Sequence, residues 1–284
     1  MKRLFKTLTI VLLIVASALS MLACDGGAST GAKKGLTLNR GTGEELYTLY
    51  RFVDEGDKLT VLDIASKAGE KTVGKIVSGA FEGNADLIEV IIPSTVTDIQ
   101  AGAFKEMNAL KKITIPFVGS NANADAFADQ TADAENKAVD QKRTFAYIFG
   151  NEEYAYGAKI TSNYGGGTED RFIPVHLEEV VVNPANSYQI PMYGFAGVKL
   201  VEKITLGDKV IAIGEYAFSG CRDLTALEIP ATVTVIYANA FAGCDGLTVI
   251  NFKGTKEQWN AIDFKDQGEI ALEKVVCSDG EIVL

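Results

Sequence analysis

The sequence predicts an α/β repeat fold, a solenoid in which short parallel strands stack one per coil of about 23 residues. The first observation is a phenylalanine that returns at a constant interval of 23 residues, at Phe81 and Phe104 and again at Phe195, Phe218 and Phe241. The second is that a leucine or valine follows each of these phenylalanines by six residues, and an apolar pair follows by nine and eleven. A constant period of roughly 20 to 50 residues is typical of solenoids, because stacked coils can bury an apolar side that a single coil cannot.

Each unit is expected to hold one short strand. Leu227 and Ile229 alternate with Glu228, so the two apolar side chains face one side of the strand and the carboxylate faces the other. Proline then ends the strand, because it has no N–H to donate and its φ is fixed. This position is taken by Pro93, Pro116 and Pro230. A second apolar pair, such as Val233 and Ile236, turns inward again before the next phenylalanine.

The first 23 residues form a predicted secretory signal peptide, with a basic start, an apolar run and Ala23 directly before Cys24. This arrangement resembles a bacterial lipobox, which implies cleavage before Cys24 and acylation of that residue. An uncleaved transmembrane helix is the alternative, but the apolar run is short for a span of about 20 residues. Two or more acyl chains would anchor the chain stably. We therefore expect a protein outside the cytoplasm, lipid-anchored at Cys24 to the bacterial cell membrane and exposed at the surface.

The rest of the chain divides by composition and by the repeat. After Cys24 a run rich in Gly, Ser and Ala predicts a flexible spacer. A cap must follow, because a bare solenoid end exposes core and unpaired strand edge. The predicted boundaries are 24–38 for the lipidated spacer, 39–74 for the N-terminal cap, 75–252 for the repeats with an irregular insertion at 117–173, and 253–284 for the C-terminal cap.

Both caps carry local signals. In the N-terminal cap, residues 59–65 read as an opening strand. In the C-terminal cap, Thr255 and Gln258 form a capping box that predicts a helix running through Ile262, with Trp259 on its inner face as a plug. A last strand is predicted at 273–276.

Charge limits the possible partners. The chain has a formal charge of −10, and removal of residues 1–23, which hold three basic residues and no acidic one, takes this to −13. Such an acidic domain is a poor candidate for nucleic acid or for anionic lipid headgroups. We therefore predict no nucleic-acid partner.

The chain contains four cysteines, of which Cys24 is assigned to lipid. Cys221 and Cys244 occupy the same position in neighbouring units, where a disulfide is sterically conceivable. Side chains in a parallel stack do not naturally point at each other, so buried free thiols are favoured. Cys277 stands alone, and no pair has the spacing of metal ligands.

Two sets of residues are candidates for a binding surface. The first set lies in the insertion, a segment that often maps to one face of a solenoid: Tyr147, Tyr154, Tyr156 and Tyr164. The second set occupies outward strand positions and would form a partly apolar stripe: Ile91, Thr114, Val181 and Thr205. Next to this stripe, Glu89 should pair with Lys112 and Glu179 with Lys203 across neighbouring strands. The aromatic residues can also pack on the solenoid, and the stripe can also follow from strand propensity alone.

Little in the sequence indicates catalysis. His176 is the only histidine, which excludes a multi-histidine metal centre, and no motif pairs it with a serine or cysteine nucleophile. The glycines at 165–167 lack the lysine of a phosphate loop. The carboxylates of Asp125, Asp129, Asp133 and Glu135 do not have the spacing of an EF-hand. We predict no cofactor, no metal and no enzymatic activity.

The repeat itself resembles a known family. The segment IPATVTVIYANAFAGCDGLTVI at 229–250 is similar to the BspA-type leucine-rich repeats of bacterial surface proteins, and the resemblance covers about residues 55–284. The tracts from Phe145 to Val182 and from Phe252 to the end resemble a longer unit and the closing segment of that family. The resemblance implies a leucine-rich-repeat solenoid and adhesion to host matrix or to neighbouring cells.

We therefore predict a membrane-anchored surface protein that binds an extracellular protein or glycan and has no catalytic role. The alternative is an extracytoplasmic hydrolase that uses carboxylates, such as a glycosidase, which would need a pocket with two carboxyl groups about 5–10 Å apart. A solute-binding lipoprotein would need two α/β lobes, and the repeat argues against it.

Overall fold

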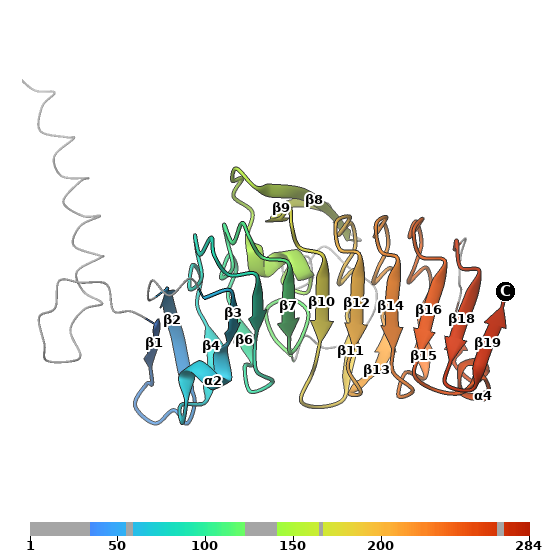
Figure 1. Cartoon of the computed structure of the whole chain (residues 1–284), viewed down its shortest axis with the longest axis horizontal. Coiled ribbons are helices and arrows are strands. Elements are labelled where there is room, and N and C mark those ends of the chain that lie inside the picture. Colours follow the sequence, from blue (N-terminus) through green and yellow to red (C-terminus); the bar gives the residue numbers. More distant parts are fainter. Residues whose placement is uncertain (1–34, 55–58, 123–140, 165–166, 266–269) are drawn as a thin grey trace, which may run out of the picture. The chain divides into compact units, whose positions relative to one another are not determined.

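The computed structural model describes residues 35–54, 59–122, 141–164, 167–265 and 270–284. Within these residues the chain winds into a solenoid of stacked, mostly parallel strands (Figure 1). The signal peptide, Cys24, the carboxylates of Asp125, Asp129, Asp133 and Glu135, and Gly165 and Gly166 lie outside the described residues.

One side of the solenoid is a nine-stranded sheet in the order β19-β18-β16-β14-β12-β10-β7-β5-β3. Its strands pair in parallel except for β18 and β19, which are antiparallel. The strands are β3 (Val61–Asp63), β5 (Glu89–Ile91), β7 (Lys112–Ile115), β10 (Glu179–Val182), β12 (Lys203–Leu206), β14 (Ala226–Ile229), β16 (Val249–Phe252), β18 (Lys274–Cys277) and β19 (Gly280–Val283).

The other side of the core carries two four-stranded sheets, ordered β1-β2-β4-β6 and β11-β13-β15-β17. Only β1 and β2 pair antiparallel in these sheets. Their strands are β1 (Gly35–Asn39), β2 (Tyr47–Val53), β4 (Val73–Ile76), β6 (Asp98–Ile99), β11 (Tyr188–Ile190), β13 (Val210–Ile213), β15 (Val235–Ile236) and β17 (Asp263–Phe264).

A row of stacked phenylalanines runs through the core between the sheets. The ring centroids of Phe81 and Phe104 are 4.8 Å apart, and those of Phe195 and Phe218 are 5.3 Å apart. Phe218 continues to Phe241 at 5.8 Å. The constant interval seen in the sequence therefore places these rings in line, as the solenoid requires.

The insertion holds one turn of the solenoid that the interval of 23 residues does not reveal. The 3₁₀-helix η1 (Phe145–Phe149) places Phe149 beside Phe104 at 6.4 Å and Phe145 beside Phe195 at 5.1 Å. Its backbone also follows the ladder, because Ile148 O accepts from Phe104 N as Ala103 O accepts from Phe81 N. The row of phenylalanines is thus continuous across the insertion.

The insertion also contains regular structure that was not predicted. Strands β8 (Gly157–Tyr164) and β9 (Gly167–Pro174) form an antiparallel hairpin beside the turns of the solenoid (Figure 1). Ile160 and Ile173 on it are fully buried. Strand pairing with the nine-stranded sheet resumes at Glu179. The prediction of an irregular segment is therefore wrong for 157–174, where alternating side chains have an apolar surface to cover.

The ends differ from the predictions in detail. Strand β1 pairs with β2, so the end of the predicted spacer is ordered from Gly35. The opening strand stops at Asp63, because its carboxylate accepts from Ala65 N and Ser66 N and begins helix α2 (Ile64–Ala68).

At the other end, helix α4 (Lys256–Asn260) begins with the predicted capping box but stops before Ile262. Trp259 packs edge-on against Phe252 and Phe264 at 5.3 Å each, which confirms its place in the plug. The predicted last strand is β18, and β19 after it was not predicted.

Helix content is low. The described helices α2, η1 and α4 have five residues each, so the α part of the expected α/β class is not supported. Strands and tight turns make up each coil instead. The expected coil of 23 residues holds only where no insertion enlarges the unit.

The cysteines of the repeat are free and buried, as favoured above. Cys221 Sγ lies 3.1 Å from Phe195 O, and Cys244 Sγ lies 3.0 Å from Phe218 O, so each thiol donates to the carbonyl of the preceding coil. Burial raises the pKa of Cys221 well above its ordinary value. Cys277 is also a free, buried thiol.

Candidate functional site

The outward face of the nine-stranded sheet brings the predicted stripe together. Each strand alternates buried and partly exposed residues, and the register aligns the partly exposed ones in rows. One row is the predicted stripe, in the order Ile91, Thr114, Val181 and Thr205, and it continues to Glu228 and Asn251. The sequence therefore placed all four residues correctly on one face.

The neighbouring row is a ladder of ion pairs. Lys112 Nζ lies 3.3 Å from Glu89 and 3.9 Å from Glu179, and Lys203 Nζ lies 3.5 Å from Glu179. Both predicted pairs are confirmed. The ladder then shifts to the stripe row, where Glu228 lies 3.5 Å from Lys203 and 2.8 Å from Lys253.

The ladder leaves its charges mutually neutralised. The hydrogen bond from Lys253, together with Lys203, holds the pKa of the Glu228 carboxyl below its ordinary value. Attraction by Glu179 raises the pKa of Lys203. The face therefore offers a partner a charge-balanced surface with a partly apolar stripe.

The tyrosines of the insertion lie elsewhere. Tyr147 lies on the side of the core that carries β6, where its ring lines a hollow together with Asp98. Tyr154 is partly buried against the hairpin and donates to Phe172 O at 3.3 Å, and burial raises its pKa. Tyr156 is 55% exposed. Tyr164 belongs to β8, and its side chain lies outside the described residues. Tyr147 therefore does not join the stripe on the nine-stranded sheet.

A column of left-handed residues runs along the turns, two residues before each phenylalanine that keeps the 23-residue interval. In the first coils this position is glycine, at Gly79 (φ 68°) and Gly102 (φ 67°). In later coils it carries side chains, at Tyr193 (φ 55°), Tyr216 (φ 51°) and Asn239 (φ 54°). The column is therefore bare at one end and filled at the other.

Two polar hollows lie where the column is bare. The first, of about 360 Å³, is lined by Ser78, Gly79, Glu82, Ala101, Gly102, Lys105, Gly150, Asn151 and Glu152. The second, of about 460 Å³, shares Ser78 and Ala101 with the first and includes Gln100 and Tyr147. Sequence reasoning missed these hollows. The available signal was the change from glycine to tyrosine or asparagine before A-F or G-F in successive units.

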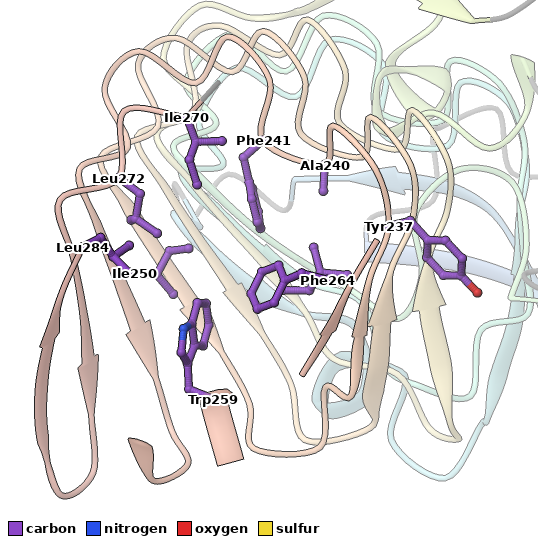
Figure 2. A pocket seen from close by; sticks show the side chains of 10 residues that line it. Tyr237, Ala240, Phe241, Ile250, Trp259, Phe264, Ile270, Leu272 and Leu284 are labelled. Carbon is purple, nitrogen blue, oxygen red and sulfur yellow. The ribbon is translucent and has the colours of Figure 1, made fainter. Parts of the chain in front are cut away.

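An apolar cavity lies at the C-terminal end of the core. Figure 2 shows Phe241, Ile250, Trp259 and Phe264 around it, and its volume is about 30 Å³. Ligand sites have volumes of about 300 Å³ or more. This cavity is a packing space beneath the cap and not a site for a ligand.

The described residues offer little for catalysis. The resolved shifts in carboxyl pKa, at Glu152, Asp170 and Glu228, are all downward, whereas a glycosidase acid needs a raised pKa. His176 is exposed. Within the described ranges, no group of three or more His, Cys, Asp and Glu side chains could hold a metal ion.

Among the residues that the structure describes, no helix has the length and apolar content needed to cross a membrane. The predicted anchor at Cys24 precedes this part of the chain.

Three solved structures are similar to parts of this chain at low identity and low TM-score. A leucine-rich repeat protein of T. pallidum is 16% identical with a TM-score of 0.34, over 78% of this chain and 71% of that one. A leucine-rich cell surface protein of Faecalibacterium prausnitzii is 21% identical with a TM-score of 0.35, over 80% of this chain but only 40% of that one. A leucine-rich repeat protein of Bacteroides ovatus is 15% identical with a TM-score of 0.28, over 88% and 72% of the two chains.

No curated protein matches the chain closely enough to count as a relative. The model of the BspA type leucine rich repeat region, in contrast, matches six copies over residues 60–148 and 170–277, which is more than half of the chain. Both matched ranges contain the phenylalanine, the strand and the second apolar pair described above. The chain belongs to the BspA-type leucine-rich repeat family.

Proposed function

We propose that this chain is a surface protein, anchored to the bacterial membrane by lipid at Cys24, that adheres to an extracellular protein through the outward face of its nine-stranded sheet. The observation that carries the proposal is the alignment of Ile91, Thr114, Val181 and Thr205 beside a ladder of neutralised charges. Members of the family are repeat proteins of the kind that present broad binding surfaces.

The form of the sheet favours a protein partner. The lysines of the ladder pair with the glutamates of the same ladder, so their charges cancel. The face therefore exerts little net attraction on a strongly charged polymer. Interface cores are typically depleted of unpaired charge and gain from apolar contact at their centre. The stripe supplies that contact, and the ladder beside it supplies polar groups for the rim.

A substitution in the stripe tests the binding face. Val181→Glu places an additional carboxylate in the middle of the stripe, beside Glu179, so the negative charges of the face outnumber the positive ones. The variant should bind about tenfold or more weakly, because the added charge would be desolvated in the complex. The probes are immobilised extracellular matrix proteins and intact neighbouring cells, and binding is measured by surface plasmon resonance and by cell attachment.

The matched control is Val235→Glu. Val235 is also a partly exposed valine in a strand, but it belongs to the short strand β15 on the other side of the core. This variant should bind as the unchanged chain does. If Val181→Glu bound as well as the unchanged chain, or if the unchanged chain bound none of these probes, the sheet would not be the binding face.

The anchor needs a separate measurement. Cys24→Ser removes the thiol that lipid would modify, so the protein should move from the membrane fraction to the soluble or secreted fraction and lose incorporation of radiolabelled palmitate. Cys277→Ser serves as the control, because that thiol is buried in the fold. Retention of label and of membrane attachment in the Cys24 variant would contradict lipid anchoring at this residue.

A further inference from the structure

We propose that the two hollows beside Gly79, Gly102 and Gly150 form one binding groove for a neutral oligosaccharide, distinct from the sheet face. The first hollow spans three successive turns, and the second continues from Ser78 and Ala101 toward Tyr147. Each volume lies within the range of about 300 to 1,000 Å³ that is typical of small-molecule sites.

The groove exists because the left-handed column lacks side chains in these turns. A Cβ built on Gly102 would meet no steric obstacle, since its nearest neighbours, Ser78 Oγ at 3.8 Å and Gly150 Cα at 3.9 Å, are at ordinary van der Waals distances. The same column holds Tyr193 and Tyr216 in later turns, where the two rings stack at 5.1 Å and occupy the surface. The fold therefore accepts side chains at this position, but glycine leaves it empty beside the first turns.

The walls present hydrogen-bonding groups whose charges are already balanced. Lys105 pairs with Glu152 and lies 3.4 Å from Glu82 and 3.8 Å from Glu106, so its ammonium takes the place that a bound cation would need. The carboxylate oxygens remain directional acceptors, and Ser78 and Asn151 add a hydroxyl and an amide. Hydroxyl groups of a sugar, each a donor and an acceptor, match this mixture.

The second hollow adds the aromatic surface that such a ligand can use. The guanidinium of Arg171 lies 5.1 Å from the centre of the Tyr147 ring, and Arg171 is itself held by Glu169 at 2.7 Å and is only 4% exposed. The ring is thus fixed in place at the edge of the hollow. A pyranose ring can lay its C–H groups on an aromatic ring while its hydroxyls reach Gln100 and Ser78.

Other ligand classes fit the groove less well. An anionic polymer would meet the three carboxylates of Glu82, Glu152 and Asp98 against only two ammonium groups, those of Lys105 and Lys142, in the lining of the two hollows. An apolar peptide would find one aromatic ring among mostly polar groups, whereas the sheet face offers a whole stripe. The chemistry of the lining therefore points to a neutral, hydroxyl-rich ligand.

The test places a side chain in the groove at Gly102 and measures the binding of oligosaccharides. Gly102→Asn introduces a side chain that tolerates left-handed φ, as Asn239 shows in the same column. The full chain is applied to an array of cello-, manno- and chito-oligosaccharides with sulfated oligosaccharides alongside, and the strongest neutral binder is titrated by calorimetry. The unchanged chain should bind a neutral oligosaccharide, and Gly102→Asn should weaken binding by about tenfold or more.

Gly243→Asn is the matched control, because Gly243 is also left-handed (φ 70°), its Cβ would meet only ordinary contacts at 3.7 Å, and it lies outside both hollows. Glu152→Gln is the second test variant, since its side chain is 73% exposed and its loss removes a charged acceptor without filling space. It too should weaken binding, and the control should not.

The proposal is overturned if no neutral oligosaccharide binds, if a sulfated one binds better, or if Gly102→Asn and Glu152→Gln both bind as the unchanged chain does. Val181→Glu should leave sugar binding intact, and Gly102→Asn should leave attachment through the sheet intact. The two proposals can therefore fail separately.

Discussion

The left-handed column shows how single residues set the surface of this solenoid. A non-glycine residue at positive φ costs about 1–2 kcal/mol, and three successive turns carry this cost at Tyr193, Tyr216 and Asn239. Their side chains offset part of it. The two tyrosine rings stack in parallel with an interplanar angle of 3°, worth about 0.5–1.5 kcal/mol, and Asn239 Nδ2 donates to the Tyr216 hydroxyl at 3.2 Å. Glycine at 79 and 102 avoids the cost and leaves the groove.

Gly197 shows a second demand, that of close approach. It has φ 74°, and a Cβ placed on it would meet Thr161 O of the hairpin at 2.9 Å, closer than real contacts allow. Gly220 has the same φ of 74° one coil later, but its Cβ would meet only Gly197 Cα at an ordinary 3.7 Å. A comparison of substitutions at these two glycines therefore distinguishes the cost of positive φ, which both share, from the cost of the close contact with the hairpin, which only Gly197 has.

We predict that Gly197→Ala loosens the hairpin and Gly220→Ala does not. Both variants should lose about 1 kcal/mol or more of unfolding free energy through φ, but only the first must push β8 away. Hydrogen exchange measured by mass spectrometry should rise across 157–174 in Gly197→Ala alone. Equal exchange in the two variants would mean that the hairpin is held by Ile160 and Ile173 and not by this contact.

At the scale of elements, the sequence predicted the regular coils and the pairing across them. Alternation at Leu227 and Ile229 was enough to identify one strand, and the constant interval then fixed its neighbours in register. The ladder from Glu89 to Lys203 followed from that register without further information. These features depend on local periodicity, which a single sequence contains.

The insertion could not be predicted in the same way. Phe149 lies 45 residues after Phe104 and 46 before Phe195, close to two intervals, yet the residues between them break the apolar pattern. Phe127, one interval after Phe104, fits the spacing better than Phe149 does, so the interval alone does not identify η1. The two hollows could not be predicted from the sequence either. They depend on the absence of side chains at glycines and on the ion pair between Lys105 and Glu152, which are 47 residues apart in the sequence.

For the whole molecule, η1 decides whether the solenoid behaves as one body or two. In a repeat array each coil contacts only its neighbours, so stability is close to a sum of coil and interface contributions. The contacts of Phe104 with Phe149, of Phe149 with Phe145 at 5.4 Å, and of Phe145 with Phe195 carry the aromatic row across the insertion. Parallel pairing of β7 with β10 spans the same junction.

This continuity predicts a single unfolding transition for the unchanged chain and a split one for Phe149→Ala. Trp259 is the only tryptophan and reports on the C-terminal end, while far-ultraviolet circular dichroism reports on all coils. In urea the two signals should coincide for the unchanged chain. Removing the fully buried Phe149 ring costs about 3–5 kcal/mol at the junction, so the circular dichroism of Phe149→Ala should begin to change before Trp259 fluorescence does.

The control is Phe218→Ala, which removes a fully buried ring within the C-terminal coils. It should instead lower the urea concentration at the midpoint of the Trp259 fluorescence transition. Coincident signals in Phe149→Ala would show that strand pairing alone couples the two halves, and separate signals in the unchanged chain would show that the junction does not couple them.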